Sequence, residues 1–266
     1  MSTVIIIPAR YDSKRFPGKP LVRLRGSKGE KKPLIQRSWE AAKRVKGVDR
    51  IIVSTDDVRI KNVANTFGAE VMMTSTSCLN GTERCAETCS KLKEQYDIVV
   101  NLQGDAPLTP YWFVEDLINE LERNPSAEVV TPVLRCDSDG HRMFMEDRKA
   151  DRVGGTTAVF TTKNKALYFS KEVIPYTAKI YKKDELCPVV HHVGVYAYRS
   201  TVLNEYLNLS EGQLEILEGL EQLRFIENDK DVYCVEVDGK GQSFWELNNP
   251  EDVSRIESKL LENNID

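Results

Sequence analysis

Runs of apolar residues separated by amphipathic stretches fill the first half of the chain. Residues 4–7 are four consecutive β-branched residues without polar alternation, which predicts a strand buried on both faces, as in a parallel sheet. Further strands are predicted at residues 21–24, 50–57, 70–73, 97–102 and 128–133. Helices are predicted between them, at residues 33–47, 58–67, 83–96 and 110–123. This repeated order of strand and helix predicts a mainly parallel, doubly wound α/β sheet with right-handed crossovers.

The pattern changes after about residue 136. Residues 137–152 are strongly polar, and Asp139-Gly140 predicts a turn there. The remaining predicted elements are β segments at 156–161, 166–169, 192–198 and 232–237, and helices from 203, at 214–224 with an interruption at Gly219, and at 250–261. We expect one domain over residues 1–266, with a core at 1–135, an elaborated middle at 136–200 and a return to the core at 201–266.

Composition and charge exclude several classes of protein. The net charge of −4 argues against a general nucleic-acid binder, because affinity for the phosphate backbone needs a broad basic surface. No signal peptide and no apolar run of about 20 residues is visible, so we expect a cytoplasmic protein that does not enter the membrane. The six cysteines contain no Cys-x-x-Cys pair, so neither a zinc site nor a disulfide framework is suggested.

A basic loop follows the first strand. Arg10, Lys14, Arg15 and Lys19 are displayed just after residues 4–7, where open α/β sheets bind ligands. Arginine forks match phosphate oxygens and lysine adds a point charge, so the loop is typical of a polyphosphate site. The alternative is a solvated basic loop, which is the commoner fate of such runs.

Two further loops carry candidate ligand-binding groups. Asp105, beside Gly104, follows the strand at 97–102 and is placed to hold Mg²⁺ on the phosphates of a nucleotide, or else it caps the next helix. Gly81 and Thr82 open a helix whose free N–H groups suit an anion or a polar ligand edge, although Thr82 is equally explained as an N-cap.

Polar residues in the second half suggest contacts with a hydroxylated, acidic substrate. His191 and His192 are adjacent in a predicted strand, so they point to opposite faces and at most one can face a site. Ser170-Lys171 and the segment 221–224 offer further polar groups, for which a solvated helix face is the common alternative.

Together these segments resemble the 3-deoxy-manno-octulosonate cytidylyltransferases, the CMP-Kdo synthetases. The matching motifs cover nearly the whole chain in the order seen in that family: Pro8-Ala9-Arg10, Arg15-Phe16-Pro17-Gly18-Lys19-Pro20-Leu21, Ser54-Thr55-Asp56-Asp57, Gly81-Thr82-Glu83-Arg84, Asn101-Leu102-Gln103-Gly104-Asp105, Ala166-Leu167-Tyr168-Phe169-Ser170, His192-Val193-Gly194-Val195-Tyr196, Leu220-Glu221-Gln222-Leu223-Arg224 and Pro250-Glu251-Asp252.

The resemblance implies a three-layer, Rossmann-like nucleotide-diphospho-sugar transferase fold with an added β-rich region for sugar binding and dimerisation. It implies a Mg²⁺-dependent homodimer that transfers CMP from CTP to Kdo or a related 3-deoxy-2-ulosonic acid, such as an amino-Kdo, for surface polysaccharide or lipopolysaccharide synthesis. Residues 1–135 would mainly bind CTP and residues 136–200 would form the added region.

The resemblance also implies a role for individual residues. The catalytic residues would be Arg10, Lys19 and Asp105. CTP would be bound by Pro8, Ala9, Arg10, Arg15, Lys19, Gly81 and Thr82. The sugar would be bound by Gln103, His192, Tyr196, Glu221 and Gln222. Asp105 would hold the metal, with Asn248 at the position of a second metal ligand.

The sequence departs from the family at three places. Asn248 replaces an aspartate, and an uncharged amide should bind Mg²⁺ more weakly. The segment 152–157 lacks the family's Asn-Pro-Asn pattern, and Lys171 replaces an arginine, so both departures bear on the identity of the sugar. Two alternatives follow: a catalytically impaired homologue that binds nucleotide in a regulatory or scaffolding role, and a glycosyltransferase, although the second usually presents an Asp-x-Asp motif.

Overall fold

The computed structural model describes residues 1–12, 16–104, 107–153, 155–179, 181–182, 185, 187–242, 246–247 and 249–266. Its strands are β1 (Thr3–Ala9), β2 (Arg23–Arg25), β3 (Lys31–Pro33), β4 (Arg50–Thr55), β5 (Glu70–Met73), β6 (Ile98–Leu102), β7 (Val129–Arg135), β8 (Thr156–Phe160), β9 (Ala166–Ser170), β10 (Val190–His192), β11 (Val195–Arg199) and β12 (Val232–Val237). Its helices are α1 (Leu34–Ala42), α2 (Val58–Thr66), α3 (Gly81–Lys91), α4 (Tyr111–Arg123), α5 (Ser138–Lys149), α6 (Ser200–Tyr206), α7 (Gln213–Glu218), α8 (Leu223–Glu227) and α9 (Asp252–Glu262), with a short 3₁₀ turn at Lys19–Leu21.

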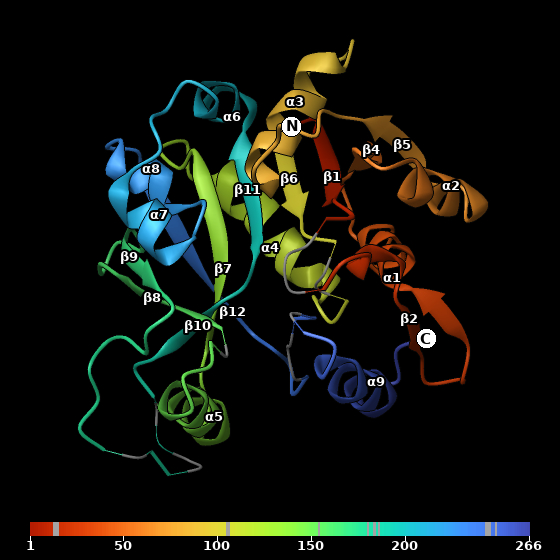
Figure 1. Ribbon diagram of the computed structural model, residues 1–266. Helices are drawn as coiled ribbons and strands as arrows, with labels where there is room; N and C mark the ends of the chain where they lie inside the picture. Colours follow the sequence, from red (N-terminus) through yellow and green to blue (C-terminus); the bar gives the residue numbers. More distant parts are fainter. Residues whose placement is uncertain are drawn as a thin grey trace.

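A ten-stranded sheet forms the middle layer of the described residues (Figure 1). Its order is β5-β4-β1-β6-β11-β7-β10-β8-β9, and β12 pairs with β7. Strands β5, β4, β1 and β6 run parallel, as does the pair of β7 and β12, whereas β11 enters antiparallel between β6 and β7. Strands β10, β8 and β9 extend the sheet with antiparallel pairs. The predicted α/β class is confirmed, and the antiparallel extension is the β-rich addition.

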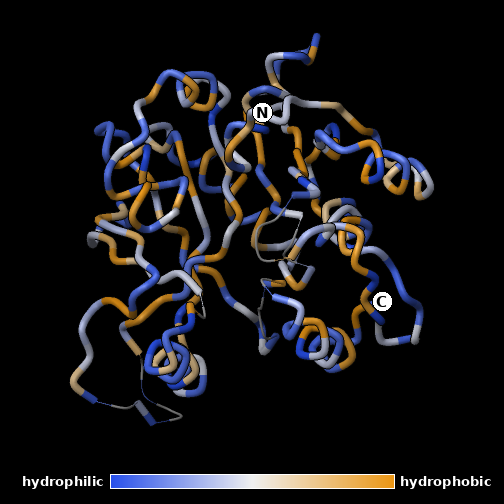
Figure 2. Tube along the Cα trace, in the orientation of Figure 1, coloured by the Kyte–Doolittle hydropathy of each residue, from blue (hydrophilic) through white to orange (hydrophobic). Residues whose placement is uncertain are grey.

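Both faces of the sheet are covered. Ile5 and Ile7 of β1 pack into one apolar cluster with α1, α2 and α4, while Val4 and Ile6 pack into a second cluster with α3, α6 and α8. All four side chains have no exposed surface, which confirms a strand buried on both faces. The central strands are accordingly apolar for most of their length, whereas α2 alternates between polar and apolar positions (Figure 2).

The strand predicted at 192–198 is in fact two strands. β10 ends at His192 and β11 begins at Val195, because the chain bends at Val193-Gly194. The two strands pair in succession along one edge of β7, and β11 then continues between β7 and β6. This bend brings a strand of the middle region to the end of β6.

Most of the polar segment 137–152 is a helix, α5 (Ser138–Lys149), so the turn predicted at Asp139-Gly140 was wrong. Asp137 caps α5 by accepting a hydrogen bond from the backbone N–H of Gly140, so Gly140 lies in the first helical turn. Only His141 and Phe144 of this helix are buried. Two buried positions give a weak hydrophobic periodicity, which explains why the helix was not predicted. Helices α1 and α3 are shorter than predicted, ending at Ala42 and Lys91.

The segment 214–224 is broken at Gly219, as predicted. Gly219 adopts a left-handed conformation (φ 60°) and ends α7, and α8 begins four residues later. Within the described ranges no helix is long and apolar enough to cross a membrane. The six cysteines are free thiols.

Candidate active site

A cavity of about 970 Å³ opens at the carboxyl ends of β1 and β6. Its wall opposite β1 is formed by the segment from α7 to the start of α8. The fold brings together residues from six separate sequence motifs, which line the cavity: Pro8, Ala9, Arg10, Lys19, Gly81, Gln103, His192, Tyr196, Glu221 and Gln222. Thr82 is not part of the lining, but its backbone N–H contacts Glu221.

The β1 loop forms the basic side of the cavity. The backbone N–H of Gly18 donates to the carbonyl of Tyr11 at 2.8 Å, which closes the loop and presents Lys19 at the start of the 3₁₀ turn. Arg10 donates to the backbone carbonyl of Leu79 at 3.2 Å, across the cavity mouth. Arg10 is therefore held beside the start of α3, and Lys19 lines the same cavity.

The start of α3 contradicts the alternative in which Thr82 is the N-cap. Its N-cap is Asn80, whose side chain accepts from the N–H of Glu83, so Thr82 is not the cap. Thr82 is buried, its hydroxyl lies 2.9 Å from that of Tyr198, and its N–H donates to Glu221. Thr82 thus fixes the first turn of α3 from within the core.

The carboxylate of Glu221 joins two sides of the cavity. It accepts from the N–H of Thr82 at 3.0 Å and from the side-chain amide of Gln103 at 3.0 Å. Burial raises the pKa of Glu221, although the hydrogen bond from Thr82 acts in the opposite direction. This carboxylate orients both Gln103 and the first turn of α3.

His192 is neutral in this site. Its ring is buried, with Nε2 2.9 Å from the hydroxyl of Thr131, and burial lowers its pKa to about 3. A group with so low a pKa is a poor proton acceptor, so the ring offers a hydrogen bond to Thr131 but no general base. His191 packs against Phe144 and does not line the cavity, as expected for adjacent strand residues.

Tyr196 and Gln222 form a buried pair beside His192. The hydroxyl of Tyr196 donates to the side-chain oxygen of Gln222 at 2.9 Å, and burial raises the pKa of Tyr196. The amide nitrogen of Gln222, and both polar atoms of the Asn101 side chain, are buried without a hydrogen-bond partner among the described residues. Such groups are costly to leave unpaired, so the amide nitrogen of Gln222, which lines the cavity, favours a polar ligand there.

Arg15, Asp105 and Asn248 lie outside the described residues. The residues before Asp105 do belong to the site, because Gln103 and Gly104 line the cavity. A Cβ atom at Gly104 would lie 3.1 Å from the carbonyl oxygen of Pro8, so glycine lets the ends of β1 and β6 approach closely. No group of three or more His, Cys, Asp or Glu side chains suited to a metal occurs in the described part of the chain.

Some cavity residues were not assigned from the sequence. Arg84 is buried and pairs with Asp56 at 2.9 Å. Glu246 approaches the backbone N–H of Gly194 at 3.4 Å. Glu215 also lines the cavity, as does Lys171, which the sequence already offered as a polar group for an acidic substrate. Arg84 belongs to the motif Gly81-Thr82-Glu83-Arg84, but no role was assigned to it. Glu246 belongs to no motif in the sequence, because its position beside the cavity depends on how the chain returns after β12.

Comparison with known proteins agrees with this geometry. Residues 4–232 match the family model described as cytidylyltransferase. A 3-deoxy-manno-octulosonate cytidylyltransferase of Maricaulis maris is 40% identical over 97% of this chain and 96% of its own length. The mitochondrial 3-deoxy-manno-octulosonate cytidylyltransferase of Arabidopsis thaliana is 39% identical over 98% of this chain and 83% of its own length. This chain belongs to the 3-deoxy-manno-octulosonate cytidylyltransferase family.

Structural comparison extends the family relationship to the fold. A CMP:2-keto-3-deoxy-manno-octonic acid synthetase complexed with CTP superposes with a TM-score of 0.82 and 32% identity, covering 99% of this chain and 100% of that one. The 4-diphosphocytidyl-2C-methyl-D-erythritol synthase of Anaerococcus prevotii shares the fold alone, with a TM-score of 0.58 and 15% identity over 97% of this chain and 96% of that one. As a cytidylyltransferase, the protein is a nucleotidyltransferase enzyme, and the glycosyltransferase alternative is wrong.

Proposed function

We propose that this cytidylyltransferase transfers CMP from CTP to the anomeric hydroxyl of Kdo or a related 3-deoxy-2-ulosonic acid, such as an amino-Kdo, and releases pyrophosphate. The main support is one cavity that has Arg10 and Lys19 on one side and the buried polar groups of His192, Tyr196 and Gln222 on the other. The first side suits a triphosphate, and the second suits a hydroxylated sugar.

The reaction requires two bond changes at the α-phosphorus of CTP. The anomeric oxygen forms a bond to this phosphorus, and the bond between this phosphorus and the oxygen that bridges it to the β-phosphorus breaks. That oxygen leaves with the pyrophosphate, and the hydroxyl proton passes to solvent. Catalysis of this kind depends mainly on positioning and on neutralising charge. Arg10 and Lys19 would neutralise the triphosphate, while Gln103 and Glu221, joined by a 3.0 Å hydrogen bond, would orient the sugar. Lys171, which also lines the cavity, would face the sugar carboxylate.

Cytidylyltransferases generally use a divalent metal ion, and we propose Mg²⁺ here. Asp105 would hold it, with Asn248 as a second, uncharged ligand. Among the residues that the structure describes, no cluster of His, Cys, Asp or Glu side chains suited to a metal occurs, so the proposed site depends on Asp105 and Asn248. The bound ion would neutralise phosphate charge.

We also propose a cytoplasmic homodimer in which residues 1–135 mainly bind CTP, 136–200 serve sugar binding and dimerisation, and 201–266 return to the core. The product would serve bacterial surface polysaccharide or lipopolysaccharide synthesis. The comparisons give no support to a regulatory or scaffolding role.

The proposed function is tested by supplying CTP, Mg²⁺ and a panel of ulosonic acids that includes Kdo and an amino-Kdo. We expect pyrophosphate release with at least one of them. Absence of release across the panel, with CTP binding retained in calorimetry, would instead support the impaired-homologue alternative.

The Gly81→Ala variant should raise the KM for CTP about tenfold, because a cost of ~1.4 kcal/mol is expected from crowding at the cavity floor. The added Cβ would lie 3.2 Å from Nδ2 of Asn101 and 3.3 Å from Nε2 of Gln103. Steady-state kinetics with varied CTP measures the effect. Gly140→Ala is the matched control, since its Cβ meets Asp137 at 3.2 Å in the first turn of α5, outside the cavity. An unchanged KM in Gly81→Ala would remove Gly81 from the CTP site.

The Asn248→Asp variant should lower the Mg²⁺ concentration needed for half-maximal activity by about tenfold, since an added charge near a cation contributes ~1–4 kcal/mol at close range. Titration of activity with Mg²⁺, and of Mn²⁺ binding by electron paramagnetic resonance, measures the change. Asn249→Asp adds the same charge one residue away and should have a smaller effect. Equal metal dependence in the natural protein and Asn248→Asp would show that residue 248 is not a ligand.

A further inference from the structure

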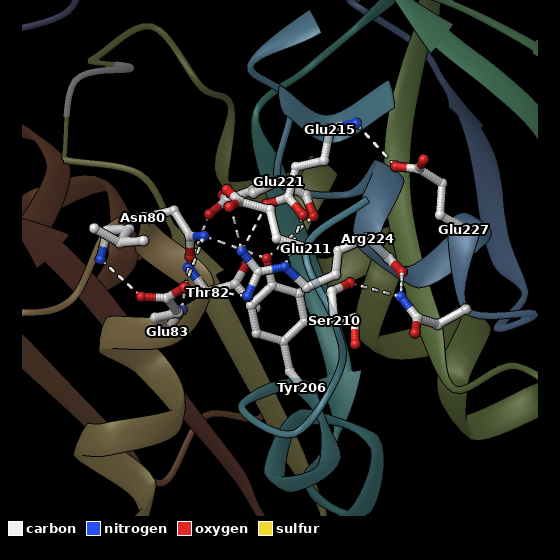
Figure 3. Close-up of polar contacts among 12 residues, drawn as sticks. Asn80, Thr82, Glu83, Tyr206, Ser210, Glu211, Glu215, Glu221, Arg224 and Glu227 are labelled. Carbon is white, nitrogen blue, oxygen red and sulfur yellow. Dashed lines mark hydrogen bonds and ion pairs between the residues drawn. The ribbon is translucent and has the colours of Figure 1, made fainter. Parts of the chain in front are cut away.

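The guanidinium of Arg224, on α8, lies buried behind the cavity wall. Its side chain is 6% exposed and is surrounded by the carboxylates of Glu83, Glu211 and Glu215 (Figure 3). The aromatic ring of Tyr206 lies 4.6 Å from the guanidinium carbon. Arg224 does not line the cavity, so its place in the Leu220–Arg224 motif needs a reason other than ligand contact.

One side of the guanidinium holds α7. Nε donates to one oxygen of Glu215 at 2.7 Å and Nη2 donates to the other at 2.8 Å, which is a bidentate pair. The backbone carbonyl of Glu215 accepts from the N–H groups of Gly219 and Leu220. Glu215 therefore anchors the turn that leads directly to Glu221 and Gln222.

The other side of the guanidinium holds the start of α3. Nη1 donates to Glu83 at 3.1 Å, and the second oxygen of Glu83 accepts from the N–H of Leu79 at 2.7 Å. The side chain of Asn80 reaches the hydroxyl of Tyr206 at 3.3 Å, and this hydroxyl donates to the backbone carbonyl of Glu221. The helix start and the Glu221 segment are thus linked a second time beside Arg224.

The carboxylates around Arg224 need a cation whose N–H groups point in several directions at once. The side chains of Glu83 and Glu215 are 13% and 6% exposed, so without Arg224 two poorly solvated carboxylates would face each other. Burial acts to lower the pKa of Arg224, but hydrogen bonds to Glu215 and Glu83 outweigh it and the pKa is raised. Lysine has the charge but lacks the planar fork that serves both partners at once.

We propose that Arg224 is a positioning residue that fixes the CTP side of the cavity relative to its sugar side. Through Glu83 it sets the start of α3, and through Glu215 it sets the segment that carries Glu221 and Gln222. This inference rests on the proposed function for the identity of the two substrates.

The test compares three conservative variants. Arg224→Lys should raise the KM for CTP and the KM for the sugar, each by about tenfold, because lysine keeps the charge but cannot bond Glu83 and Glu215 at the same time. Glu83→Gln should raise mainly the KM for CTP, and Glu215→Gln mainly the KM for the sugar. The affinity for CTP alone, from calorimetry, should fall in Arg224→Lys and Glu83→Gln. A purely structural role would not separate the two substrates.

The control is Arg135→Lys. Arg135 forms a bidentate pair with Glu236 at 2.7 and 2.6 Å between β7 and β12, away from the cavity. Both KM values should remain unchanged in this control. If Arg224→Lys fails to fold, Glu83→Gln keeps the Arg224–Glu215 pair and carries the test.

The inference is overturned if the KM values of Glu83→Gln and Glu215→Gln match those of the natural protein, or if both variants affect the two substrates equally. Failure of the proposed function would look different. The natural protein would then release no pyrophosphate with any sugar, while the calorimetric comparison of CTP binding would still test the Glu83 side.

Discussion

The Asp105→Asn variant should lose turnover by about 1,000-fold or more, because neutralising a ligand of the catalytic cation removes charge stabilisation worth ~4 kcal/mol. Asp105 directly follows Gln103 and Gly104, which line the cavity at the end of β6. Its carboxylate is expected to hold the metal on the CTP phosphates, and an amide of the same shape removes only the charge. Pyrophosphate release under saturating CTP and sugar measures the loss.

Two observations separate this role from a contribution to folding. The melting temperature of Asp105→Asn should stay close to that of the natural protein, and the variant should bind Mn²⁺ more weakly in the presence of CTP. Asp116→Asn is a matched control on α4, where burial raises the pKa of the carboxyl group and the side chain does not line the active-site cavity. Turnover by Asp105→Asn at the natural rate would exclude Asp105 as the metal ligand.

The Glu221→Gln variant should lower kcat/KM about 100-fold, since hydrogen bonds to a charged group contribute ~1.5–3 kcal/mol each and Glu221 accepts two. An amide can accept from only one of Thr82 and Gln103, because its nitrogen would face the other donor. Either the start of α3 or Gln103 would then lose its hydrogen bond, and with it its orientation. Kinetics with each substrate varied in turn measures this effect, and Glu205→Gln, at an exposed carboxylate on α6, is the control.

The raised pKa of Glu221 predicts opposite effects of pH on activity and on stability. Activity needs the ionised carboxylate, so kcat/KM should fall as pH decreases through the raised pKa, above the usual range near 4.5. The effect on stability has the opposite sign. Because the pKa of Glu221 is higher in the folded than in the unfolded protein, the group stabilises the fold below its unfolded pKa, and this stabilisation is lost as the pH rises through its folded pKa. Glu221→Gln should therefore remove this acidic limb without lowering the melting temperature at neutral pH. An acidic limb that persists in Glu221→Gln would assign it to another group.

Local sequence patterns were sufficient for most of the elements. Hydrophobic periodicity and composition predicted the buried strand at residues 4–7. They also predicted the first and last residues of β5 and β12 as the structure has them. The pattern failed where tertiary contacts override it. α5 is polar because only one face touches the added region, and the bend at Val193-Gly194 depends on β7, which pairs with β10 and β11 in turn.

Part of the candidate site was likewise predicted from local sequence, and part of it was not. The β1 loop and the residues after β6 were predicted from the sequence, because the order of strands and helices places the carboxyl ends of parallel strands together. The positions of Arg224 and Glu246 were not, since each depends on segments distant in sequence.

The sequence by itself determined the α/β class, the family and the basic loop at the end of β1, because these depend on local periodicity and on motifs that are contiguous in the chain. Only the tertiary structure decided that Glu221 joins Thr82 to Gln103, that His192 is neutral, and that Arg224 holds α3 and α7 together. Hydrogen bonding, burial and pKa depend on distances between residues far apart in the sequence, and these distances exist only in the folded chain.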